Sequence, residues 1–167
     1  MRLSLSVPFL LIALLPSWAV AQAAPATCPA VLQHVQPRLQ DEKPINLCSH
    51  AGQVVLVVNT ASFCGYTGQY KSLEALHSTY GPRGLVVLGF PSNDFGGQEP
   101  GTAKQIADFC ENTFGVKFPM FAKSRVTASA GAAANPLIAD LAQRTGQWPR
   151  WNFHKYVIAR DGRTVTS

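Results

Sequence analysis

Two runs of apolar residues, Val54–Val58 and Leu85–Phe90, constrain the fold of this chain more than any other feature. Neither run alternates apolar with polar residues, and such continuous runs are typical of strands that are buried on both faces of a sheet. Between them, apolar and aromatic side chains recur at helical spacing over Thr67–Tyr80, and the following Gly81-Pro82 is a standard helix stop. Strand, helix and strand in close succession predict a βαβ unit, in which the two strands are parallel.

Two further helices and a hairpin are predicted downstream of this unit. Thr102 and Gln105 form a capping box at the start of a helix over 102–114. An Asn-Pro start and a Gly end mark another helix over 136–144, and an Asp-Gly turn lies within a hairpin over 156–165. A βαβ half joined to a β-hairpin half predicts an α/β chain with a thioredoxin-like fold, in which helices flank a central mixed sheet.

The segment 1–21 has the pattern of a secretory signal peptide. Arg2 gives a basic start, Leu3–Val20 is almost entirely apolar, and Ala19–Ala21 supplies the small-x-small pattern that signal peptidases recognise. A membrane anchor is the alternative, but Pro16 and the shortness of the apolar run disfavour it. We therefore expect an exported protein, periplasmic or secreted, with no stable membrane insertion.

The remaining chain has the size of one domain. Residues 22–44 are expected to form an N-terminal segment, with a short turn of helix over 31–39, and residues 45–167 are expected to form the thioredoxin-like domain. The net charge of +5 falls to +4 once the leader, with its single charge at Arg2, is removed. Because the basic residues are scattered rather than gathered in a stripe, we expect no nucleic-acid binding.

Cys64 is the residue whose position points to chemistry. It follows the first buried strand and precedes the first helix, where backbone N–H groups and the helix dipole favour negative charge. The thiolate that such a position favours is the nucleophilic form of cysteine. The alternative is a buried structural cysteine, but the small and polar neighbours Ser62, Gly65 and Thr67 disfavour it. The position therefore indicates a reactive thiol.

Three motifs in this chain resemble the motifs of the glutathione peroxidase family. Asn59–Thr67 is similar to the family pattern Asn-x-Ala-Ser-x-Cys/Sec-Gly-x-Thr, while Gly89–Pro100 and Trp151–Lys155 are similar to the second and third motifs. They occur in the family's order, and the resemblance extends over about 45–165. It implies a thioredoxin-like fold and an enzyme, a thiol-dependent peroxidase that reduces hydrogen peroxide and organic hydroperoxides to water and alcohols in the response to oxidative stress.

The resemblance also implies which residues form the catalytic site. In the family a peroxidatic Cys or Sec is surrounded by a Gln, a Trp and an Asn, which match Cys64, Gln98, Trp151 and Asn152 here. Splitting an O–O bond requires a thiolate nucleophile and a donor for the leaving oxygen, and amide and indole N–H groups are neutral donors. Taken singly, Gln98 is more typical of a loop residue, Trp151 of a core residue and Asn152 of a turn former. Together with Cys64 in the family pattern, they indicate catalysis.

The expected product at Cys64 is a sulfenic acid, which a thiol must reduce. The resemblance implies glutathione or a thioredoxin-like protein as the reductant, and no metal or organic cofactor. Some family members carry a resolving cysteine on the helix after the Gln motif. Cys110 lies on that helix, but Glu111 occupies the position that aligns with the resolving cysteine, and Cys110 falls on the apolar face. Cys110 is therefore either a resolving cysteine or a buried core residue.

Cys28 and Cys48 flank the N-terminal segment, which has no core of its own. In the oxidising compartment expected for an exported protein, a disulfide between them would hold this segment in place and leave Cys64 free. The alternative is a bond between Cys48 and Cys64, which would remove the proposed nucleophile.

The C-terminal part of the chain is short in two respects. Trp151 follows Gly146 closely, without the long insertion that serves tetramer contacts in some family members, so the chain resembles the compact members and we expect a monomer. Family members also continue beyond the final hairpin with another strand and a helix, whereas this sequence stops at Ser167. We expect either a truncated C-terminal end or a domain without that helix.

Two other functions use the same fold. A thiol–disulfide exchanger would need a second cysteine near Cys64, but Thr67 stands where a Cys-x-x-Cys pair would end. A peroxide sensor needs the same reactive cysteine and differs only in passing its oxidation to a partner. A metal site is not indicated, because the Cys and His residues have no ligand spacing.

Overall fold

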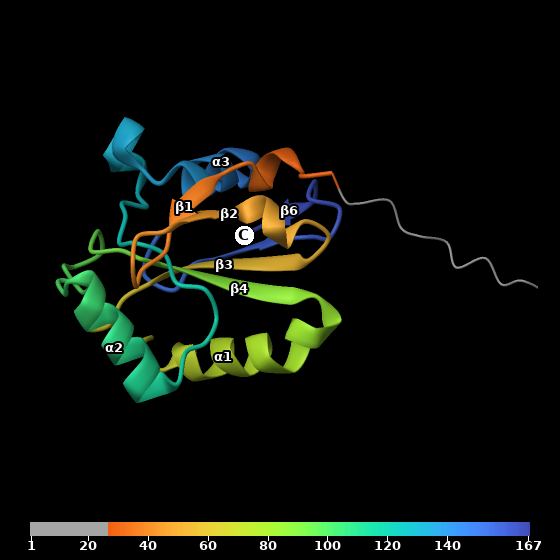
Figure 1. The fold of residues 1–167 in the computed structure, drawn as a ribbon. Helices are drawn as coiled ribbons and strands as arrows, with labels where there is room; N and C mark the ends of the chain where they lie inside the picture. The colour runs from red at the N-terminus through yellow and green to blue at the C-terminus, as the bar shows by residue number, and fades with distance from the viewer. Residues whose placement is uncertain (1–26) are drawn as a thin grey trace, which may run out of the picture.

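The computed structural model describes residues 27–167, and a four-stranded sheet forms its centre (Figure 1). The strand order is β4-β3-β5-β6. β3 (Val54–Thr60) and β4 (Leu85–Pro91) pair in parallel over their whole length. β5 (Lys155–Ile158) and β6 (Val165–Thr166) form an antiparallel hairpin whose first strand also pairs with β3. The parallel strand pair and the hairpin predicted from the sequence are therefore both present.

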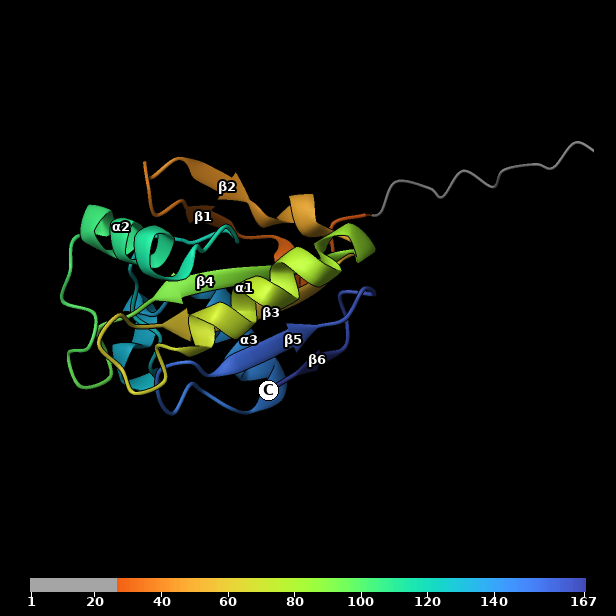
Figure 2. The same ribbon diagram turned by 90° about the horizontal axis from the view of Figure 1, so that it is seen from below.

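Helices cover both faces of this sheet (Figures 1 and 2). α1 (Gln69–Tyr80) and α2 (Ala103–Phe114) lie on one face, and α3 (Pro136–Thr145) lies on the other. The capping box predicted for α2 forms: the Thr102 hydroxyl accepts from the backbone N–H of Gln105, and the Gln105 side chain accepts from the backbone N–H of Thr102. The three predicted helices are thus present close to their expected bounds.

The N-terminal segment differs from the prediction. The helical turn expected over 31–39 is limited to the 3-10 helix η1 (Ala30–Leu32), after which the chain forms β1 (Val35–Pro37). β1 pairs antiparallel with β2 (Pro44–Asn46) in a separate two-stranded sheet. The predicted helix is wrong over most of its length because Pro37 lacks the N–H that a helix needs, and the residue before a proline prefers extended backbone.

A disulfide ties this segment to the rest of the molecule. Cys28, just before η1, is bonded to Cys48 in the 3-10 helix η2 (Leu47–His50). This is the pairing that leaves Cys64 free. Val31 and Leu32 of the segment are also buried in the main core. The N-terminal segment is therefore held both by a covalent bond and by apolar contacts.

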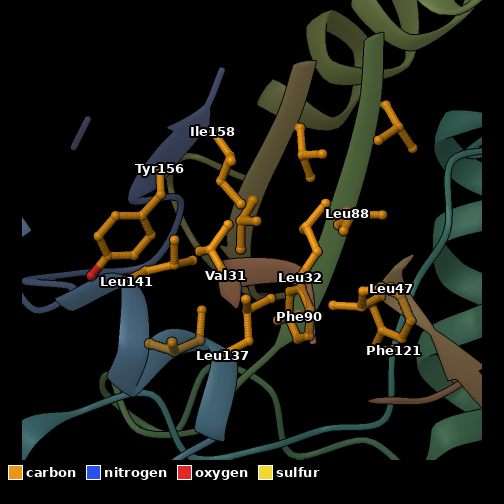
Figure 3. Close-up of a cluster of buried hydrophobic side chains, with 14 of the residues drawn as sticks. Val31, Leu32, Leu47, Leu88, Phe90, Phe121, Leu137, Leu141, Tyr156 and Ile158 are labelled. Carbon is orange, nitrogen blue, oxygen red and sulfur yellow. The ribbon is translucent and has the colours of Figure 1, made fainter. Parts of the chain in front are cut away.

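Two apolar cores lie on the two faces of the sheet. Figure 3 shows part of the first, in which the N-terminal segment and α3 pack against β3, β4 and β5. There Phe90 of β4 stacks on Phe121, with ring centroids 4.7 Å apart. The second core packs α1 and α2 against the opposite face and includes Tyr70, Ile106 and Cys110. The two cores fix the strands whose ends carry the loops described below.

Two more 3-10 helices complete the fold: η3 (Gly81–Arg83) precedes β4, and η4 (Ala128–Ala133) precedes α3. Within the range 27–167, no helix is both long enough and apolar enough to cross a bilayer. The signal peptide predicted for 1–21 lies outside the described residues.

Candidate active site

Three loops meet at one edge of the central sheet. Because β3 and β4 are parallel, their carboxyl ends lie side by side, with Thr60 paired to Pro91. β5 runs in the opposite direction, so its amino end is at the same edge, where Lys155 pairs with Val58. The three motifs singled out from the sequence follow β3, follow β4 and precede β5. The topology thus brings them together at the carboxyl ends of parallel strands, where open α/β sheets bind their ligands.

The loop after β3 presents Cys64, whose thiol is free and partly buried. The Thr67 hydroxyl accepts a hydrogen bond from the backbone N–H of Cys64 and donates one to the carbonyl of Ala61, both at 3.0 Å. The backbone N–H of Tyr66 donates to the Cys64 Sγ at 3.4 Å. This bond brings a neutral hydrogen-bond donor directly to the Cys64 sulfur.

The hydrogen bond to the Cys64 sulfur comes from this loop and not from the helix that was expected to supply it. α1 begins at Gln69, so Cys64 lies more than a turn before the first helical residue. The N–H that reaches the sulfur belongs to Tyr66, which is in the turn. The sequence identified the motif that contains Thr67 but gave this residue no role, although its hydroxyl holds both ends of the loop.

Gln98 and Asn152 are in direct contact, although 54 positions separate them in the chain. The Asn152 Nδ2 donates to the Gln98 Oε1 at 2.9 Å. Because the oxygen of the Gln98 amide accepts this bond, the Nε2 group is left to donate elsewhere. The backbone N–H of Phe63 donates to the Gln98 carbonyl at 3.0 Å, which joins Gln98 to the residue next to Cys64. The structure therefore links two of the three expected donor residues to the Cys64 loop.

Trp151, the third expected donor residue, lies at the surface with 42% of its area exposed. Its ring packs against Phe95, with centroids 5.6 Å apart. The Asn59 Nδ2 donates to the Trp151 carbonyl at 3.1 Å, and the Asn59 carbonyl accepts from the Phe153 N–H at 2.7 Å. Phe153 has a φ of 64°, a left-handed conformation that is rare for a bulky residue. Asn59 thus fixes the turn that carries Trp151 and Asn152, a role that the sequence alone did not show.

Cys110 lies in the core between α1 and α2. Only 2% of its surface is exposed, and burial raises the pKa of its thiol to about 11. It belongs to the same apolar cluster as Tyr70, and Cys64 packs against the edge of that cluster. In this conformation Cys110 is a protonated, buried thiol, which agrees with the core alternative. For it to react with Cys64, α2 would have to unwind locally.

A buried acidic residue that the sequence did not single out lies directly after Gln98. Glu99 has no exposed surface, and the hydroxyl and backbone amide of Ser62 face its carboxyl. Burial raises the pKa of this carboxyl, and the facing hydroxyl and amide of Ser62 offset the shift only in part. The nearby Lys123 Nζ donates to the Glu99 backbone carbonyl at 3.1 Å. Glu99 lies within the second motif, but its position there gave no indication that it is buried.

A free thiol that accepts an N–H bond, in a loop at the carboxyl edge of a mixed sheet, is the arrangement expected of a thiol-dependent oxidoreductase with a thioredoxin-like fold. Solved structures support this class. T. cruzi GPX1 matches with a TM-score of 0.63 and 30% identity over 82% of this chain and 85% of its own. The apo form of Trgpx matches with a TM-score of 0.60 and 34% identity over 79% of each chain. The predicted fold class is confirmed.

A thiol:disulfide interchange protein from Chlorobium tepidum also matches, with a TM-score of 0.60 over 87% of each chain. Its identity of 18% shows the shared fold alone. In the part of the chain that the structure describes, no group of three or more His, Cys, Asp or Glu side chains is placed to hold a metal ion.

Sequence comparison narrows the class to one family. The model of the family described as glutathione peroxidase matches residues 32–141. Glutathione peroxidase-like peroxiredoxin gpx1 from Schizosaccharomyces pombe is 44% identical over 77% of this chain and 82% of its own. Hydroperoxy fatty acid reductase gpx1 from Synechocystis sp. is 42% identical over 75% of this chain and 78% of its own. The chain belongs to the glutathione peroxidase family, and it is an oxidoreductase that reduces peroxides with thiols.

Proposed function

We propose that Cys64 is the peroxidatic cysteine of this peroxidase and that Gln98, Trp151 and Asn152 assist it as hydrogen-bond donors. The observation that carries this proposal is the edge of the sheet where the three motifs meet. There the free thiol of Cys64 receives an N–H bond, and the Gln98–Asn152 amide pair is bonded to the adjacent residue of the same loop. Together these features supply a nucleophile and neutral donors beside it.

In the first step the Cys64 thiolate attacks the terminal oxygen of the hydroperoxide ROOH. An S–O bond forms, the O–O bond breaks, and the alkoxide RO⁻ leaves and takes a proton to become the alcohol. Cys64 becomes a sulfenic acid, and the peroxide has accepted two electrons. The Gln98 Nε2, which is oriented as a donor by the bond from Asn152, can stabilise the negative charge as it moves from sulfur to the leaving oxygen.

In the second step an external thiol attacks the sulfenic sulfur, which gives a mixed disulfide and water. A second thiol then releases the reduced enzyme. We propose glutathione or a thioredoxin-like protein as the source of these thiols, in keeping with the names of the relatives. The buried state of Cys110 favours direct reduction of Cys64 over an internal disulfide. The cycle uses no metal or organic cofactor.

The name of the Synechocystis relative, a hydroperoxy fatty acid reductase, supports organic hydroperoxides as substrates beside hydrogen peroxide. The proposed physiological role is the response to oxidative stress. The proposed location is outside the cytoplasm, in the periplasm or secreted, with a signal peptide at 1–21 removed and the enzyme acting as a monomer. The Cys28–Cys48 disulfide supports this location, because such bonds persist in oxidising compartments.

The experiment is steady-state turnover of hydrogen peroxide by the purified protein, with thioredoxin or glutathione supplied in turn. Cys64→Ser should abolish turnover with either reductant, while Cys110→Ser, the matched control, should retain it. Loss of thioredoxin-dependent turnover in both variants would make Cys110 a resolving cysteine. Reaction of one equivalent of peroxide without cycling would favour a sensor, and Cys64-independent turnover would contradict the proposal.

A further inference from the structure

A cavity of about 380 Å³ opens between the Cys64 loop and the first half of α2. Its size falls within the range of about 300–1,000 Å³ that is typical of small-molecule pockets. Most of its wall is apolar and is formed by Phe63, Pro100, Ile106 and Phe109. The rings of Phe63 and Phe109 stack with centroids 6.4 Å apart, and 67% of Phe63 is exposed. A large aromatic ring thus stands at the surface directly beside Cys64.

Ser62, Glu99 and Gln105 are the polar residues of the lining. Ser62 and Glu99 are buried, and the Ser62 hydroxyl and amide face the Glu99 carboxyl. Ser62 lies two residues before Cys64, and Glu99 directly follows Gln98. This part of the lining therefore belongs to the loops that carry the proposed catalytic residues.

We infer that this cavity is the specificity pocket for the organic group of an alkyl or aryl hydroperoxide. The inference rests on the proposed role of Cys64. A hydroperoxide bound with its hydrocarbon against the exposed Phe63 ring, Pro100 and Ile106 presents its reactive oxygens to the loop that carries Cys64. Hydrogen peroxide has no group to place in the pocket. The apolar walls therefore favour organic peroxides over hydrogen peroxide.

Gly101 offers the sharpest test. It lines the cavity, and a Cβ added there would lie 3.4 Å from the Gln105 Cβ and 3.4 Å from the Ile106 Cγ1. Gly101→Leu therefore adds bulk to the cavity wall while it leaves every proposed catalytic residue in place. Phe109→Ala removes an aromatic ring from the cavity lining and serves as the second variant. Asn112→Ala, on an exposed position of α2 outside the cavity, is the matched control.

The measurement is kcat/KM for cumene hydroperoxide and for hydrogen peroxide with the same reductant. Both pocket variants should lower kcat/KM for cumene hydroperoxide about tenfold, the loss expected when about two methylene groups go unburied, and should leave hydrogen peroxide within about twofold. Asn112→Ala should change neither. An equal loss for both peroxides, or no loss for cumene hydroperoxide, overturns the inference. Hydrogen peroxide turnover that survives Cys64→Ser overturns the proposed function instead.

Discussion

The Cys28–Cys48 disulfide should set much of the stability of this protein without contributing to its chemistry. The bond spans 20 positions, and the chain-entropy relation gives about 11 cal/mol/K for a loop of that length. At 25 °C this corresponds to about 3 kcal/mol of unfolding free energy. For a domain of this size the same loss lowers Tm by roughly 10 °C. The double variant Cys28→Ala/Cys48→Ala should show this decrease.

Equilibrium unfolding in urea, followed by tryptophan fluorescence, measures the difference directly. The wild type treated with dithiothreitol should lose about the same free energy as the double variant, and the reductant should have no effect on the variant itself. The rate at which Cys64 reacts with hydrogen peroxide should stay within about twofold, because neither cysteine belongs to the loops that carry Cys64, Gln98 and Asn152. A loss below about 1 kcal/mol would refute the entropic reasoning, since the loop-closure relation requires about three times as much.

Three further outcomes follow from the site. Asn152→Leu removes the bond that orients the Gln98 amide, so the second-order rate with hydrogen peroxide should fall about 100-fold, whereas a rate within twofold of wild type would exclude a role for that bond. Glu99→Gln should make the free energy of unfolding less dependent on pH. The raised pKa of the Glu99 carboxyl stabilises the fold below the ordinary carboxyl pKa, and this contribution is lost as pH rises through the raised value. A pH series of unfolding curves should show this decline for the wild type and not for the amide variant. Iodoacetamide at neutral pH should modify Cys64 and leave Cys110 unmodified in the native protein, because the Cys110 thiol is buried and has a pKa of about 11. If peptide mapping finds equal labelling of the two cysteines, the placement of Cys110 in the core is contradicted.

Much of the fold could be predicted from local patterns. Continuous apolar runs identified β3 and β4, and capping residues identified α2 and α3. β1 was missed because its conformation depends on pairing with β2, a contact that no local pattern shows. Short strands in small separate sheets carry too few residues for a periodicity to be recognised.

For the candidate site, the sequence predicted the residues better than the contacts between them. The motifs brought Cys64, Gln98 and Asn152 into one proposal, and the structure shows how the strand directions bring their loops to one edge. The Asn152–Gln98 bond could not be derived from the sequence, since it depends on the register between strands far apart in the chain. Glu99 could not be recognised either, because an acidic residue in a loop is ordinarily exposed, and only the tertiary packing shows that this one is buried.

The most direct test of the central proposal is to trap the sulfenic acid. The protein is treated with one equivalent of hydrogen peroxide in the presence of dimedone, and the modified peptide is identified by mass spectrometry. The proposal predicts a dimedone adduct on Cys64 alone, which Cys64→Ser abolishes and Cys110→Ser retains. An adduct on Cys110, or a folded wild type that forms none while peroxide is consumed, would contradict the assignment of Cys64 as the peroxidatic cysteine.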